Sequence, residues 1–170
     1  MAAFDGPSDS APSADGGEDA EIEAGTDLPG WDIERTVDDR AELTVGERVE
    51  FSKTISDEDV RAFAAASGDT NPLHLDAAYA DETRFGGRIA HGTLVSGLIS
   101  AALARLPGTV VYLSQDMEFL APVRIGDRVT AEVEVVEDLG GGRLRLSTTI
   151  LNDGDPCIDG EAVVLVPDEE

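Results

Sequence analysis

Cysteine and lysine are almost absent from this chain of 170 residues, and basic residues as a group are few. Cys157 is the only cysteine, so no disulfide can form within the chain and a metal site built from several thiolates is excluded. Lys53 is the only lysine among 12 basic residues, which face 36 acidic ones and leave a formal net charge of -24. Because such a surface repels nucleic acid, we expect no nucleic-acid partner.

The chain also lacks a hydrophobic run long enough to cross a membrane. Its longest apolar stretch, residues 92–106, would rise only about 22 Å as a helix, whereas the hydrocarbon core of a bilayer is about 30 Å thick. The first ten residues, MAAFDGPSDS, contain neither the basic segment nor the apolar run of a secretory signal. We therefore expect no membrane span and a cytoplasmic protein.

The acidic residues extend over the whole chain. Residues 1–40 hold 12 acidic and 2 basic side chains, and residues 41–170 hold 24 and 10. An acidic tail alone would confine the excess to one segment, whereas adaptation to a salty cytoplasm spreads it over the surface. The distribution favours a halophilic protein.

One tail and one domain are predicted. Residues 1–30 are rich in Asp, Glu, Ser, Gly and Pro and show no apolar period, which is typical of a segment that cannot order itself. We predict an acidic, disordered tail over residues 1–40 and a single folded domain over residues 41–170, a size usual for one domain. Trp31 and Ile33 could pack on the domain, but charges surround them.

The pattern of the folded part predicts an α+β protein. A strand, a helix capped by Ser56 and stopped by Gly68, a buried apolar helix and four further strands follow one another. Short turns between strands favour antiparallel neighbours, and one long helix must cover the sheet. This is the layout of a hot-dog fold, in which a curved antiparallel sheet wraps around a long central helix. The expected ranges are strand 47–55, helix 56–68, a short helical piece at 76–82, helix 92–106, and strands 109–120, 127–137, 143–152 and 157–166.

The segment GDTNPLHLD, residues 68–76, contains a candidate acid/base pair. Pro72 prevents a helix from continuing, so a shaped loop can bring Asp69 and His74 to one point. A carboxylate beside an imidazole can hold a water molecule and transfer protons. The plainer alternative is that Asp69 caps a turn and His74 has no chemical role, and for this spacing alone it is the commoner outcome.

A second candidate lies where the apolar helix opens, at His91 and Gly92. The first N–H groups of a helix are unpaired and favour an oxygen that carries negative charge. A thioester carbonyl that becomes an enolate is such an oxygen. The alternative is that Gly92 only allows close packing while His91 caps the helix.

Two segments together, GDTNPLHLD at 68–76 and RIAHGTLVSGL at 88–98, resemble the signature segments of the MaoC-like, (R)-specific enoyl-coenzyme A hydratase family. The resemblance continues through YLSQDMEFLAPVRIGDRVTAEVEV at 112–135 and GEAVVLVP near the end, and covers about residues 45–167. It implies a homodimeric hot-dog enzyme that reversibly hydrates trans-2-enoyl-coenzyme A to the (R)-3-hydroxyacyl thioester. No metal or cofactor is implied, because coenzyme A is part of the substrate.

The resemblance also assigns residues. It implies that Asp69 and His74 are the catalytic pair, that Asn71 supports their loop, and that the Gly92 N–H binds the thioester oxygen. Ser100, farther along the central helix, matches a position where family members can carry a serine near the catalytic aspartate. The implied setting is fatty-acyl degradation or the supply of monomers for polyhydroxyalkanoate.

Two alternatives keep the fold but change the function. A relative with a different pocket could act on a branched or dicarboxylic acyl thioester. A subunit that binds acyl thioesters without catalysis is the other alternative, although a pure binder would not need both Asp69 and His74.

Overall fold

The computed structural model describes residues 22–167, which form one antiparallel sheet and a set of helices. In chain order the elements are β1 (Asp32–Arg35), the 3-10 helix η1 (Arg40–Glu42), β2 (Arg48–Thr54), α1 (Asp57–Ser67), α2 (Pro72–Leu75), α3 (Ala77–Asp81), α4 (Gly92–Leu103), β3 (Val111–Phe119), β4 (Arg128–Gly140), β5 (Arg143–Asn152) and β6 (Asp155–Leu165). Within the described residues, no helix is both long and apolar enough to cross a membrane.

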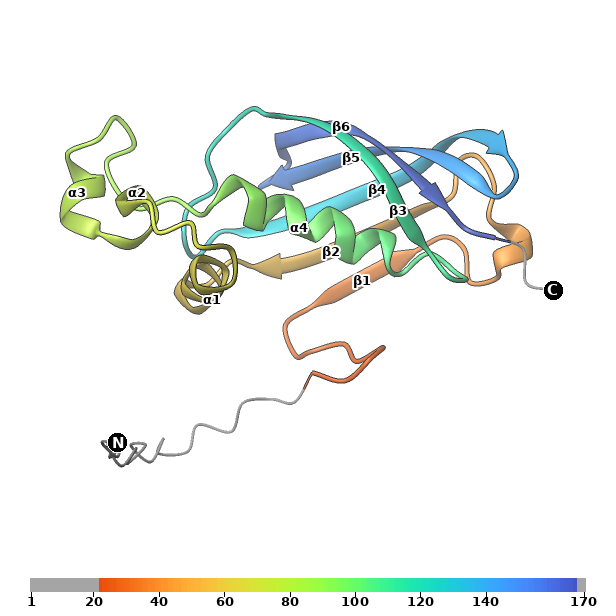
Figure 1. Cartoon of the computed structure of the whole chain (residues 1–170), viewed down its shortest axis with the longest axis horizontal. Coiled ribbons are helices and arrows are strands. Elements are labelled where there is room, and N and C mark those ends of the chain that lie inside the picture. Colours follow the sequence, from red (N-terminus) through yellow and green to blue (C-terminus); the bar gives the residue numbers. More distant parts are fainter. Residues whose placement is uncertain (1–21, 168–170) are drawn as a thin grey trace, which may run out of the picture.

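The six strands are ordered β1-β2-β4-β5-β6-β3, and every neighbouring pair is antiparallel. Helix α4 lies across one face of this sheet, while α1, α2 and α3 gather at one end of the molecule (Figure 1). The predicted hot-dog arrangement, a sheet around a long central helix, is therefore confirmed.

The core lies between α4 and the sheet, and alternation along the strands produces it. From Val129 to Val135 every second side chain of β4 points inward, as the period of a strand requires, and α4 presents an apolar side to the same space. The core side chains of these two elements, all at most 5% exposed, are Val129, Ala131, Val133, Val135, Val95, Leu98, Ile99, Ala102 and Leu103.

Helix α1 begins and ends where the sequence predicts. The Ser56 hydroxyl accepts from the Asp59 N–H, and the Asp59 carboxylate accepts from the Ser56 N–H, which forms a capping box. Gly68 ends the helix in the left-handed conformation, with φ of 80°. Burial alone would raise the pKa of Asp59, but hydrogen bonds from Lys53 and Ser56 outweigh it and lower that pKa.

The ordered domain begins before the predicted boundary at residue 41. Strand β1 pairs with β2, and the Trp31 ring meets the edge of Phe51 at a centroid distance of 5.3 Å. Val37 is only 2% exposed. Apolar side chains spaced between charges thus suffice to add a strand to the sheet. The rest of the predicted tail, residues 1–21, lies outside the described residues.

Two further features differ from the prediction. Strand β3 pairs with β6 rather than with β4, the next strand in the chain. The link after Phe119 carries the chain away from β3, which is an edge strand, to the position between β2 and β5. Helix α4 ends at Leu103, three residues early, where Arg105 and Leu106 make tighter bonds to the carbonyls three residues back. The following Pro107 disfavours helical backbone at Leu106, so the helix cannot continue through that residue.

Candidate active site

The loop after α1 is shaped by side chains that cap its own backbone. The Asp69 carboxylate accepts from the Asn71 N–H at 3.2 Å, and the Asn71 amide oxygen accepts from the Leu73 N–H at 3.0 Å. Asn71 is thereby the N-cap of α2, a single helical turn that the sequence did not predict. Pro72 occupies the first helical position, where its missing N–H costs nothing. Asp69 thus does cap a turn, and its carboxylate is still exposed.

His74 lies on α2 and is only 8% exposed. Its Nδ1 is 2.8 Å from the carbonyl oxygen of Ile89. A carbonyl only accepts, so neutral His74 carries its proton on Nδ1 and keeps a lone pair on Nε2. An imidazole held in this tautomer is ready to take up a proton at Nε2.

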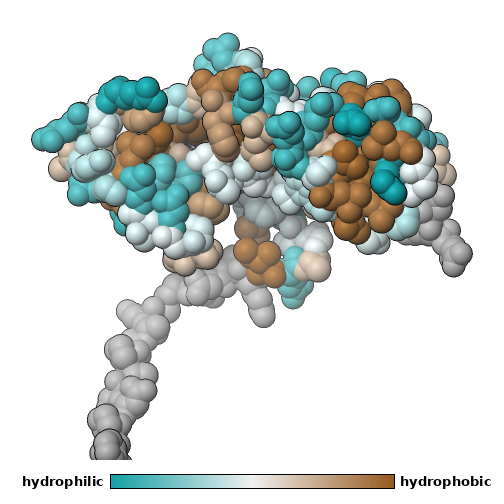
Figure 2. All heavy atoms as spheres, turned by 45° about the horizontal axis from the view of Figure 1, so that its top comes forward, coloured by the Kyte–Doolittle hydropathy of each residue, from teal (hydrophilic) through white to brown (hydrophobic). Residues whose placement is uncertain are grey.

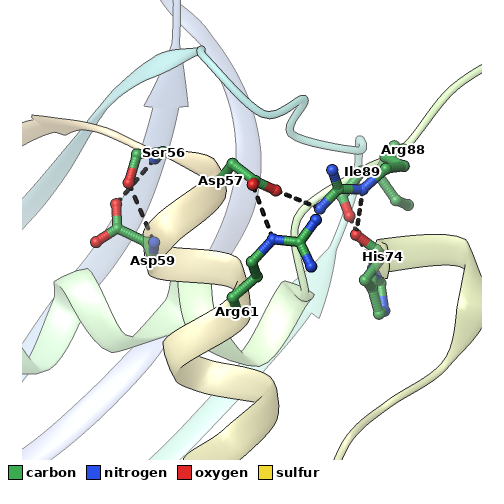
Figure 3. A network of polar contacts seen from close by, with 7 residues as sticks. All are labelled: Ser56, Asp57, Asp59, Arg61, His74, Arg88 and Ile89. Carbon is green, nitrogen blue, oxygen red and sulfur yellow. Dashed lines mark hydrogen bonds and ion pairs between the residues drawn. The ribbon is translucent and has the colours of Figure 1, made fainter. Parts of the chain in front are cut away.

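An arginine fixes the backbone of His74 from the other side. Arg88 Nε donates to the His74 carbonyl at 2.6 Å, and its guanidinium also reaches the Asp57 carboxylate at 2.5 Å (Figure 3). Hydrogen bonds from Arg61 and Arg88 lower the pKa of Asp57. The start of α1 is in this way tied to the turn that carries His74.

His91 is the third polar side chain at this point and is 1% exposed. Its Nε2 lies 2.9 Å from the backbone oxygen of Asp69, and its ring centroid is 4.0 Å from that of His74. It occupies the N-cap position of α4, as the sequence suggested, yet it makes no side-chain cap hydrogen bond. Its hydrogen bond goes to the Asp69 loop instead.

Asp69, His74 and His91 therefore converge. Each offers one carboxylate oxygen or ring nitrogen, and these three atoms lie within 4.8 Å of one another. A water molecule about 2.8 Å from each of two such atoms can bond to both at once. The arrangement can hold and deprotonate a water molecule, and it combines one exposed residue, Asp69, with two buried histidines.

The same three groups are also of the types that bind divalent transition metals. Two histidines and one carboxylate can hold such an ion and leave positions open for other ligands. Both rings bond to a backbone carbonyl through their other nitrogen, which is common for metal ligands too. The absence of a metal from the reaction stays a prediction.

A groove lies beside the start of α4. It has a volume of about 270 Å³ and is mostly apolar; its lining residues are Arg84, Phe85, Ile89, Ala90, Gly92, Phe119, Leu120, Ala121 and Pro122. A larger hollow of about 730 Å³ is lined by Glu50, Asp127 and Glu132 among others. We assign the site to the smaller groove, because Ile89 and Gly92 connect it to the histidines.

Gly92 itself shows the close packing that was the alternative explanation. A Cβ at this position would lie 2.8 Å from Cε1 of Phe119. Close packing does not conflict with a role for its N–H, since Gly92 is the first residue of α4 and also lines the groove. Its role as donor to a thioester oxygen stays a prediction.

Helix α4 does not bring Ser100 close to the cluster. Ser100 lies eight residues beyond Gly92 on α4, which is about 12 Å along the axis, and its side chain is exposed. Its supporting role stays a prediction. Sequence reasoning assigned no role to Arg88, although it is the first residue of the segment RIAHGTLVSGL and a rare basic residue in a very acidic chain.

Comparison with known proteins points to one group. A family model described as "MaoC like domain" matches residues 40–151. A 3-hydroxybutyryl-CoA dehydratase of Methylorubrum extorquens is 48% identical over 76% of this chain and 84% of its own. An (R)-specific enoyl-CoA hydratase of Rhodospirillum rubrum is 45% identical over 74% of this chain and 90% of its own. The solved structure of an (R)-hydratase from Aeromonas caviae, described as involved in PHA biosynthesis, is 44% identical with a TM-score of 0.71, and covers 74% of this chain and 98% of its own.

Proposed function

Because the chain belongs to the MaoC-like dehydratase family, we propose that it is a hydro-lyase that reversibly adds water to trans-2-enoyl-coenzyme A and forms the (R)-3-hydroxyacyl thioester. The observation that carries this proposal is the convergence of Asp69 and His74 within 4.8 Å, next to the start of α4.

The reaction follows from the chemistry of these groups. The Asp69 carboxylate and the His74 Nε2 lone pair hold one water molecule, and the pair takes a proton from it as its oxygen attacks the β-carbon. Charge moves to the thioester oxygen, where the Gly92 N–H and the start of α4 stabilise the enolate. The pair then supplies a proton to the α-carbon, so its protonation state is restored after each turnover. No cofactor takes part, since coenzyme A belongs to the substrate.

The proposed enzyme is a homodimer joined through β3. This strand is an edge of the sheet, and a long apolar edge strand is a template for pairing with another chain. Figure 2 brings the side of β3 forward and shows hydrophobic surface there between polar side chains. The exposed apolar side chains on β3 and just after it are Val111, Tyr112, Leu113, Phe119 and Leu120. Phe119 and Leu120 also line the groove, so a second copy would border the site.

The cellular setting is part of the same proposal. The acidic charge of the folded region favours a cytoplasm rich in salt. Hydration of enoyl thioesters there would serve fatty-acyl degradation or the supply of monomers for polyhydroxyalkanoate. The Aeromonas caviae relative is described as involved in PHA biosynthesis.

The test is spectrophotometric. The pure protein is incubated with crotonyl-coenzyme A in molar potassium chloride, and loss of the conjugated enoyl absorbance is followed. We expect rapid loss and, by chiral analysis, the (R)-3-hydroxybutyryl thioester as product. No loss with crotonyl-, hexenoyl- or branched enoyl-coenzyme A, or an (S) product, would refute the proposal.

A further inference from the structure

His91 is a buried histidine to which the proposed reaction gives no step. Its ring packs against two others, with centroids 4.0 Å from His74 and 4.8 Å from Phe63. Its Nε2 is 2.9 Å from the Asp69 carbonyl oxygen, and the next residue in the chain is Gly92. One side chain thus contacts both members of the proposed pair and adjoins the proposed donor to the thioester oxygen.

The hydrogen bonds give the two histidines opposite tautomers. Because a carbonyl oxygen only accepts, neutral His91 carries its proton on Nε2, whereas His74 carries it on Nδ1 to reach Ile89. In the described part of the chain, His91 Nδ1 is buried with no hydrogen-bond partner. A second proton on His91 would create a buried N–H without an acceptor, which is unfavourable.

From these contacts we infer that His91 is a positioning residue: it holds the Asp69 backbone and the His74 ring in their reactive arrangement and itself transfers no proton. The inference rests on the proposed hydratase function and divides the roles within that site. His74 has its free lone pair at Nε2 for the water molecule, while His91 uses its single N–H to fix the loop.

The other hydrogen bonds of Asp69 are local: its N–H donates to the Ser67 hydroxyl at 3.1 Å, and its carboxylate accepts from the Asn71 N–H. Within the part of the chain that the structure describes, the bond from His91 is the one that ties Asp69 to a distant segment. The Asp69 carboxylate is exposed, and the residue follows Gly68, whose left-handed backbone ends α1. The bond from His91 joins this loop to the residue before α4, so the carboxylate and the Gly92 N–H keep a fixed relation. A displacement of about 1 Å in a catalytic group can cost about 10²-fold in rate.

The tautomers can be read without any activity. The chain has two histidines, so a ¹⁵N-histidine-labelled sample gives two imidazole spin systems, and His91→Gln assigns them by removing one. At mildly alkaline pH we expect His74 as the Nδ1–H tautomer and His91 as the Nε2–H tautomer. Finding both rings in the same tautomer would overturn the inference.

A matched pair of variants tests positioning. Both His91→Gln and His91→Asn remove the ring and its stacking, but the glutamine amide nitrogen can reach the position of Nε2, whereas the asparagine amide reaches only that of Nδ1. For crotonyl-coenzyme A we expect His91→Asn to lower kcat by about 10²-fold while KM stays within about threefold of the wild-type value. His91→Gln should recover most of that loss.

Equal losses in the two variants would overturn the positioning role. So would wild-type kcat in both, or a kcat in both as low as that of His74→Ala, which would make His91 a proton carrier. Thermal unfolding of each variant shows whether it is folded. If the wild-type protein hydrates no enoyl thioester, the proposed function fails, whereas the tautomer measurement still decides the arrangement of the two rings.

Discussion

Replacing Gly92 with alanine tests whether the thioester oxygen binds at the start of α4. The new Cβ would lie 2.8 Å and 2.9 Å from Cε1 and Cδ1 of Phe119. Carbon atoms in contact are ordinarily about 3.5–4.0 Å apart, so the ring or the helix start must move by about 1 Å. Phe119 is 58% exposed and the clash is with its ring. We expect the ring to swing away, and the free energy of unfolding to fall by about 1 kcal/mol, the low end of overpacking costs.

The effect on catalysis should be larger than the effect on folding. The displaced ring enters the groove of about 270 Å³ that Gly92 and Phe119 share, or the Gly92 N–H leaves its place. The first change fills space that the substrate needs, and the second displaces a donor aimed at developing charge. Either way kcat/KM should fall by about 10²-fold, equivalent to about 2.7 kcal/mol of transition-state stabilisation.

Gly97→Ala is the matched control on the same helix. A Cβ at Gly97 meets no atom within 4 Å, and alanine favours a helix over glycine by up to about 1 kcal/mol. Hydration of crotonyl-coenzyme A and thermal unfolding are measured for both variants. The control should be at least as stable as the wild-type protein and equally active. If Gly92→Ala is as active as Gly97→Ala, the groove beside α4 is not where the thioester oxygen binds.

Four further changes have defined outcomes. Gly160→Ala places a Cβ 2.0 Å from the Asp116 carbonyl oxygen; denaturant unfolding should show a loss of at least about 2 kcal/mol as β3 separates from β6, and an unchanged midpoint would contradict the close pairing. The lowered pKa of Asp59 means that its contribution to stability is present above the ordinary value of 3.8 and is lost as pH falls through the folded value. Lys53→Met should therefore cost about 1 kcal/mol at neutral pH, and the difference from wild type should shrink on acidification; a difference that grows would refute this. Asn71→Ala removes the N-cap of α2, which should cost about 1 kcal/mol and lower kcat more than it raises KM; unchanged kcat would show that the cap does not support the loop. Treatment with EDTA should leave hydration intact, whereas a loss that zinc restores would show that the three-residue cluster holds a catalytic metal.

Much of the fold could be predicted because short-range patterns determine it. The alternation of Val129 to Val135 and the turn at residues 140–142 predict β4 and β5, and Ser56 and Gly68 bound α1 correctly. Strand β1 was missed because its four residues, DIER, carry one apolar side chain, and their partner strand lies elsewhere in the chain. No local sequence pattern indicates that β3 pairs with β6 rather than with another strand.

For the candidate site, the sequence predicted which two residues meet but not the contacts that hold them in place. The Pro72 loop indicated that Asp69 and His74 could meet, and the family resemblance gave them roles; the structure brings them together. The hydrogen bond of His91 to the Asp69 loop joins residues 22 positions apart. The hydrogen bond of Arg88 to the His74 backbone joins residues 14 positions apart. Such contacts depend on how α1, α2 and α4 pack against one another, and the spacing of residues in the sequence does not predict that packing.

The most direct test of the account is the turnover of crotonyl-coenzyme A by Asp69→Asn and His74→Ala beside the wild-type protein, with circular dichroism as the check on folding. The carboxylate and the imidazole act together on one water molecule, so each variant should stay folded and lose at least about 10²-fold in kcat. Near-normal turnover in both folded variants would contradict the assignment of the pair as the catalytic acid and base.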